Sequence, residues 1–87
     1  MTLETMNSLY EIVEEEWPGQ VPPGGLAPEM PIFYGGIGLD SVDGATLILS
    51  LEEKFGIEID PETISMDVFE TVGALCDFIE LRTMEHA

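Results

Sequence analysis

Apolar residues recur at steps of three and four positions in the first part of the chain, which predicts an amphipathic helix from Thr2 to about Trp17. Pro18 and Gly19 end this helix. The three glutamates at 14–16 lie at the negative end of the helix dipole, and we interpret them as a solvated face, with partner contact as the alternative. The stripe expected to face inward consists of Leu3, Met6, Tyr10, Val13 and Trp17, with Leu9 and Ile12 widening it.

A second helix is predicted from about Ser41 to Phe55. Asp40 suits its N-cap because the carboxylate can accept the unpaired backbone N–H groups of the first turn, and Gly56 suits its C-cap. Ser41 then falls at the first helical position, where its hydroxyl is open to solvent and to another protein. Two apolar stripes indicate either packing on two sides or a docking face, which we favour. The stripe suited to burial is Leu47, Ile48, Leu51 and Phe55, and the stripe beside Ser41 is Val42, Ala45 and Leu49.

The connection from Gln20 to Leu39 is rich in proline and glycine, so we expect no regular element in it. Four apolar residues should hold its second half on the core: Ile32, Phe33, Ile37 and Leu39.

The last third of the chain predicts short elements followed by one long helix. Residues 57–59 alternate like a strand but are too few to stand alone, so we expect an extended segment that buries Ile57 and Ile59. Asp60-Pro61-Glu62 can open at most a short helix, with a further turn at 67–69. Thr71 caps the last helix, and the tail from Thr83 to Ala87 is expected to fray. The inward stripe of this helix is Val72, Leu75, Cys76 and Ile79, with Phe78 and Leu81 extending it.

Together these elements predict an all-α fold, a small four-helix bundle of three main helices plus one short helix, with a long first loop. We expect a single domain over residues 1–87, ordered from about 2 to 82. A chain of this length buries roughly 60–65% of its extended-chain surface, which leaves little space for an enclosed active site. One cysteine excludes an intramolecular disulfide and fits a reducing compartment.

The charge is extreme for this length. Eighteen acidic residues against two basic ones give a net charge of −16. Such a surface repels nucleic acid and anionic lipid headgroups and attracts basic protein surfaces, although acidity can also serve solubility alone. No apolar run is long enough to span a membrane, and no basic segment suggests a signal peptide. We therefore expect a cytoplasmic protein that binds neither nucleic acid nor membrane.

The residue patterns of an enzyme are missing. Ser41 as a nucleophile would need a base, and the only histidine, His86, lies in the tail. Glycines do not flank Ser41 as a nucleophile elbow requires, and a calcium-binding loop centred on Gly44 lacks the required acids. Cys76 faces the predicted core. We expect no catalytic residue and no metal site.

Residues 40–43, Asp-Ser-Val-Asp, precede the segment Leu-Glu-Glu-Lys-Phe-Gly-Ile-Glu-Ile at residues 51–59, and Thr71-Val72 opens another helix. This combination resembles the acyl carrier protein family from about Phe33 to Ile79. The resemblance implies that Ser41, beside the N-cap Asp40, carries 4′-phosphopantetheine. A phosphopantetheinyl transferase would donate this arm from coenzyme A, with magnesium, and the arm's thiol would carry acyl groups as thioesters.

The resemblance also assigns a partner-binding face and shows departures from the family pattern. Thr46 stands where housekeeping members usually have glutamate, Gly44-Ala45 replaces bulkier residues before it, and Gly35-Gly36 replaces an acidic pair. These changes remove charge or rigidity near Ser41 and suggest a dedicated pathway. The implied partner-binding residues are Val42, Asp43, Ala45, Leu49, Glu52 and Glu53.

Three functions remain open at this point. The first is a free-standing, monomeric acyl carrier protein of fatty-acid, polyketide or specialised lipid synthesis, which would meet acyltransferases, ketosynthases or acyl-activating enzymes through their basic docking patches. The second is an aminoacyl or peptidyl carrier of the D-alanyl or nonribosomal type. The third is an unmodified acidic helical adaptor, which predicts that Ser41→Ala leaves function intact.

Overall fold

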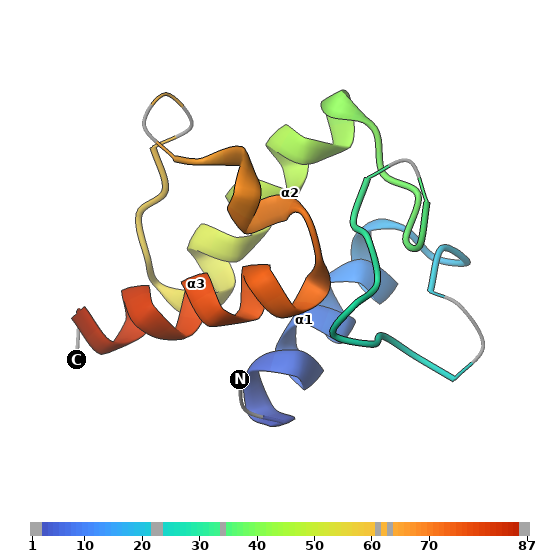
Figure 1. Cartoon of the computed structure of the whole chain (residues 1–87), viewed down its shortest axis with the longest axis horizontal. Coiled ribbons are helices and arrows are strands. Elements are labelled where there is room, and N and C mark those ends of the chain that lie inside the picture. Colours follow the sequence, from blue (N-terminus) through green and yellow to red (C-terminus); the bar gives the residue numbers. More distant parts are fainter. Residues whose placement is uncertain (1–2, 22–23, 34, 61, 63, 86–87) are drawn as a thin grey trace.

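The computed structural model describes residues 3–21, 24–33, 35–60, 62 and 64–85. Three α-helices form the fold, together with a short 3₁₀ helix, η1, and no strand is present within the described ranges (Figure 1). The all-α prediction is therefore confirmed. The elements are α1 (Leu3–Glu16), α2 (Ser41–Phe55), η1 (Met66–Phe69) and α3 (Val72–Glu85).

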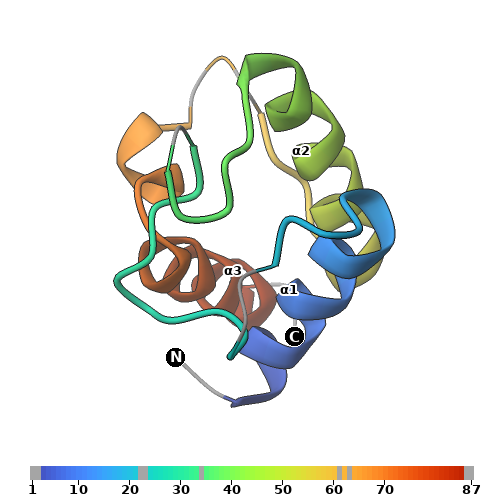
Figure 2. The same cartoon turned by 90° about the vertical axis from the view of Figure 1, so that its right-hand side faces the viewer.

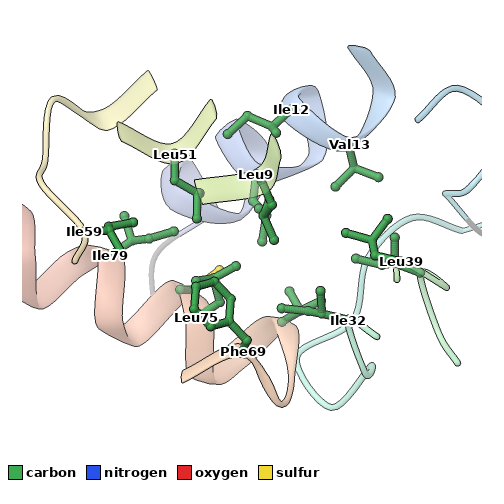
Figure 3. Packing of buried hydrophobic residues seen from close by; sticks show 14 of the residues in the cluster. Leu9, Ile12, Val13, Ile32, Leu39, Leu51, Ile59, Phe69, Leu75 and Ile79 are labelled. Atoms are coloured by element: carbon green, nitrogen blue, oxygen red, sulfur yellow. The ribbon is translucent and has the colours of Figure 1, made fainter. Parts of the chain in front are cut away.

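One hydrophobic core joins the three helices. Helix α1 packs against both α2 and α3, and η1 packs on α3. Figure 3 shows Leu9 of α1, Leu51 of α2 and Leu75 of α3 gathered at the centre of this core. The four main residues of the inward stripe predicted for the last helix are buried, Phe78 is half-buried, and both isoleucines of the extended segment are buried. The buried cluster is Leu9, Ile12, Val13, Ile32, Ile37, Leu39, Leu47, Leu51, Ile57, Ile59, Phe69, Val72, Leu75, Cys76 and Ile79.

The buried face of α1 differs from the predicted stripe. Leu3 and Tyr10, expected inside, are 77% and 37% exposed, whereas Thr5 is buried. The spacing of Thr5, Leu9, Ile12 and Val13 also fits one helix face, and this face meets α2 and α3. The apolar pattern of α1 allowed two overlapping faces, and packing against the other helices selected one.

The described residues of the first loop form no helix or strand, as predicted, but the path of the loop is fixed by backbone hydrogen bonds. The amide of Val72 donates to the carbonyl oxygen of Met30 at 2.9 Å, and that of Gly73 donates to the carbonyl oxygen of Pro28 at 2.8 Å. The loop therefore satisfies two N–H groups that the first turn of α3 leaves without an intrahelical partner. Figure 2 shows the loop running beside η1 and the start of α3 on its way to α2.

The same loop is also closed on itself. The amide of Ile37 donates to the carbonyl oxygen of Pro31, and that of Leu39 donates to the carbonyl oxygen of Ile32, both at 3.1 Å. The aromatic ring of Phe33 meets that of Phe69 edge-on, with 6.3 Å between their centroids. The prediction that apolar residues hold the second half of the loop on the core is confirmed.

The segment before α3 contains a turn and then η1. At its start the amide of Glu62 donates to the Asp60 carboxylate at 2.9 Å, and the described residues there form no helix; Pro61 lies outside the described residues. The short helix is η1, at the position predicted for the further turn. Thr71 caps α3 as predicted, because its hydroxyl oxygen accepts the amide of Ala74 at 3.1 Å.

Helix α3 continues to Glu85, beyond the predicted end. Its last turns are held by Arg82, which donates to the carbonyl oxygen of Glu58, and by Thr83, which donates to that of Glu80. Leu81, predicted to extend the buried stripe, is instead 57% exposed. Residues 86–87, at the end of the predicted frayed tail, lie outside the described residues. None of the described helices combines the length and the apolar character needed to cross a membrane.

Candidate functional site

Ser41 is the first residue of α2 and is exposed. Asp40 precedes it as the N-cap, and its carboxylate oxygen Oδ1 accepts the amides of Val42 and Asp43, each at 3.0 Å. The predicted N-cap and the predicted position of Ser41 are both confirmed. The cap fixes the backbone on either side of the serine while leaving the side chain at the surface.

Asp43 closes the cap from the other side. Its Oδ2 accepts the backbone amide of Asp40 at 3.1 Å, which completes a reciprocal capping box. Its Oδ1 accepts the indole N–H of Trp17 at 3.0 Å. The sequence assigned Asp43 to the partner-binding face, and the structure adds an internal role for both of its oxygens.

The loop before Asp40 turns sharply at two glycines. Gly36 has φ +49° and Gly38 has φ +81°, a region that side chains with a Cβ rarely adopt. A Cβ on Gly36 would also collide with the carbonyl oxygen of Pro31. This turn buries Leu39 in the core and brings Asp40 to the surface immediately afterwards.

The outer face of α2 exposes apolar side chains next to Ser41. Val42 is 76% exposed and Leu49 is 61% exposed, and Ala45 and Glu53 are also exposed. Thus the second apolar stripe is not packed against another part of the described structure, as the docking-face interpretation requires.

Glu52 differs from its neighbour Glu53. Its side chain is half-buried, and its Oε2 accepts the backbone amide of Ile59 at 2.9 Å. Since Gly56 ends α2 in the left-handed conformation (φ +66°), the chain folds back and brings this amide to Glu52. The sequence placed Glu52 among the partner-binding residues and gave no sign of this bond.

Acidic side chains rim an open groove between α1 and α2. Its volume is about 260 Å³, and its lining includes Glu15, Glu16 and Glu53. Lys54 lies at the same groove and pairs with Glu11, with 2.7 Å between Nζ and Oε2. The hydrogen bond from Lys54 to this carboxylate raises the pKa of the lysine. The glutamates at 14–16 are exposed, as expected of a solvated face.

The described residues offer little for catalysis or metal binding. Cys76 is fully buried, and loss of hydration raises the pKa of its thiol to about 11, with the charges of Glu80 and Asp77 contributing. A thiol in this state is a poor nucleophile. No group of three potential metal ligands occurs in the part of the chain that the structure describes. His86 lies outside that part.

Comparison with known proteins gives this site its family. Residues 8–79 match the family described as "Phosphopantetheine attachment site". A helical fold with this match defines a phosphopantetheine carrier domain. An acyl carrier protein from Renibacterium salmoninarum is 34% identical over 80 residues, which cover 87% of this chain and 88% of that protein. The chain therefore belongs to the acyl carrier protein family, whose members are carriers rather than enzymes and use phosphopantetheine as their cofactor. No solved structure gives a significant match.

Proposed function

We propose that this chain acts as an acyl carrier protein in which Ser41 bears the 4′-phosphopantetheine arm. The observation that carries the proposal is the exposed hydroxyl of Ser41 at the first position of α2, directly after the Asp40 cap. A modifying enzyme can reach a hydroxyl in this place without unfolding the domain. The Renibacterium relative is named an acyl carrier protein, which supports an acyl cargo over an aminoacyl one.

The chain's contribution is to present the serine and to accommodate the negative charge that follows modification. In the transfer, the Ser41 oxygen would lose its proton and attack the phosphorus of coenzyme A that bears the pantetheine arm. The pyrophosphate bond to that phosphorus would break, so adenosine 3′,5′-bisphosphate would leave and the arm would remain on Ser41 as a phosphodiester. The positive end of the α2 dipole favours an anion at this position. The amides of Val42 and Asp43 remain bonded to Asp40, so the dipole rather than these two donors would stabilise the phosphodiester. When attached, the arm supplies a thiol that holds acyl groups as thioesters.

Partner enzymes would approach the exposed face of α2. Val42, Ala45 and Leu49 offer apolar contact, and Glu53 offers a carboxylate at the far end of the same helix. With a net charge of −16, the whole molecule attracts basic surfaces. The partners proposed are a phosphopantetheinyl transferase, then acyltransferases, ketosynthases or acyl-activating enzymes with basic docking patches. We propose a cytoplasmic monomer.

A dedicated pathway, such as polyketide or specialised lipid synthesis, fits the departures near Ser41. Thr46 is neutral and half-buried where housekeeping relatives carry a glutamate. Gly44 has no side chain, so this position in the first turns of α2 offers little surface to a partner. Partner enzymes adapted to a glutamate at position 46 would lose their contact with that carboxylate here. Malonyl transfer from a housekeeping transferase should therefore be slower to this protein than to a housekeeping carrier, and equal rates would refute the dedicated pathway.

The carrier function is tested by intact mass after incubation with coenzyme A, magnesium and a broad-specificity phosphopantetheinyl transferase. We expect one added phosphopantetheine on the parent protein and none on Ser41→Ala. Circular dichroism of both proteins checks that they are folded. A folded parent that accepts no arm would favour the unmodified acidic adaptor instead. Loading of the modified protein by amino-acid-adenylating enzymes, but not by acyl-activating ones, would favour the aminoacyl carrier.

A further inference from the structure

Trp17 connects the end of α1 to the first turn of α2. Its indole Nε1 donates to Oδ1 of Asp43 at 3.0 Å, across 26 positions of sequence. The backbone of Trp17 is fixed on both sides, because its amide donates to the carbonyl oxygen of Val13 at 2.8 Å and its own carbonyl oxygen accepts the amide of Gln20 at 3.0 Å. The half-buried indole therefore extends from a fixed stretch of backbone and donates its N–H to a capping side chain.

Further hydrogen bonds link Asp43 to the residues on both sides of Ser41. The second carboxylate oxygen of Asp43 accepts the amide of Asp40, and the carboxylate of Asp40 accepts the amides of Val42 and Asp43. If the Asp43 side chain turned to another rotamer, the Asp40 amide would lose its acceptor and the capping box would open. Trp17 holds Asp43 against that change, because an indole bond to a carboxylate is a charge-assisted hydrogen bond.

We propose that Trp17 is a positioning residue for the modification of Ser41. Its N–H keeps the capping box closed, so the transferase meets a preformed start of α2. This inference rests on the proposed function of Ser41. When the competent conformation is only partly populated, the apparent affinity of a partner falls in proportion to that population. Loss of the indole N–H should therefore raise the KM for the carrier and leave kcat of the bound complex nearly unchanged.

Two replacements of Trp17 in the full chain separate the N–H from the bulk of the ring. Trp17→Phe removes the donor and part of the ring, and 3-benzothienylalanine at the same position replaces only the N–H by sulfur. With coenzyme A, magnesium and the transferase, we expect the KM of both variants to rise roughly 3- to 10-fold, with kcat within about twofold of the parent.

A matched control separates positioning from a general loss of stability. Ile79→Val trims the core on α3, away from Ser41, and should leave the KM unchanged although it lowers stability. Unchanged KM in both Trp17 variants, or an equal rise in Ile79→Val, would overturn the inference. The parent and Ser41→Ala are measured alongside, and absence of transfer to the folded parent would refute the proposed function itself.

Hydrogen exchange of the unmodified protein tests the coupling without any enzyme. In both Trp17 variants the amide of Asp40, whose acceptor is the Asp43 carboxylate, should exchange roughly 3- to 10-fold faster, while the amide of Leu75 in α3 keeps its rate. Equal exchange at Asp40 in parent and variants would show that the indole does not hold the cap, and would overturn the inference whatever the transfer kinetics.

Discussion

The backbone amide of Gly73 and the carbonyl oxygen of Pro28 lie 2.8 Å apart, so the first loop rests directly on the first turn of α3. A Cβ added at Gly73 would lie 2.9 Å from that oxygen and 3.3 Å from the Cβ of Pro28. The nearest of these atoms belongs to the backbone and cannot turn aside as a flexible side chain could. The absence of a side chain at Gly73 is thus what allows the loop to cap α3.

Gly73→Ala should destabilise the protein even though alanine is the better helix former. Overpacking costs about 1–3 kcal/mol, and the helix propensity of alanine returns about 1 kcal/mol of this. We expect the free energy of unfolding, measured in urea, to fall by up to about 2 kcal/mol. A rise in stability would contradict the close approach of Pro28 to α3.

Gly44→Ala should have the opposite effect. A Cβ there would lie 3.5 Å from Cζ of Phe33, an ordinary van der Waals contact, and Gly44 lies within α2. We expect a gain of about 1 kcal/mol from helix propensity and a melting temperature about 4–8 °C higher. Measured beside Gly73→Ala by thermal unfolding, this pair applies the same substitution at two sites with opposite expected signs. A melting temperature at or below that of the parent would contradict the ordinary van der Waals contact expected between the added Cβ and Phe33.

The bounds of α2 could be predicted from the sequence because local residues set them. Asp40 supplies the capping carboxylate and Gly56 supplies the left-handed residue that ends the helix. Both signals act within a few positions of the helix ends, and both lie beside the candidate serine. The candidate site was therefore the part of the chain that sequence reasoning described best.

Contacts between distant segments could not be predicted in the same way. The bond from Trp17 to Asp43 spans 26 positions, and the bond from Ile59 to Glu52 depends on how the chain folds back after α2. No pattern of residue spacing in the sequence indicates either of these hydrogen bonds. The prediction of which face of α1 is buried was wrong for a related reason. The helix has two overlapping apolar stripes, and only the positions of α2 and α3 decide which of them is buried.

Alanine substitutions at Glu52 and Glu53 should differ in their effect on stability, because Glu52 has a structural hydrogen bond and Glu53 is exposed. Glu52→Ala removes the acceptor of the Ile59 amide, and the loss of such a bond costs about 1–3 kcal/mol. Glu53→Ala alters an exposed side chain and should stay within about 0.5 kcal/mol of the parent. The free energies of unfolding of Glu52→Ala, Glu53→Ala and Glu52→Gln are compared by urea unfolding. Glu52→Gln keeps an acceptor for the Ile59 amide. Equal stability of Glu52→Ala and Glu53→Ala would remove the assigned role of Glu52.

Leu49 and Leu81 provide a matched test of the docking face. Both leucines are more than half exposed, but Leu49 lies on α2 and Leu81 on α3. We expect Leu49→Ser to raise the transferase KM for the carrier roughly 3- to 10-fold through lost apolar contact. Leu81→Ser should leave it unchanged, and both variants should keep the stability of the parent. Equal kinetics for the two variants would count against α2 as the docking face.

Burial of the Cys76 thiol makes the stability of the protein depend on pH in the alkaline range. Its pKa rises from the usual 9.0 to about 11 in the folded protein. Below pH 9 the thiol is protonated whether the chain is folded or unfolded. Above it the unfolded chain releases the proton first, so the free energy of unfolding falls as pH rises between about 9 and about 11.

Cys76→Ala isolates this effect from other groups that titrate at high pH. The alanine variant leaves a small cavity and is expected to be less stable than the parent at about pH 8. Because only the parent carries the buried thiol, its stability advantage should shrink as the pH is raised to about 10.5. Urea unfolding of both proteins without the cofactor arm, at the two pH values, gives the comparison. A constant difference would mean that the thiol of Cys76 titrates alike in the folded and unfolded chains.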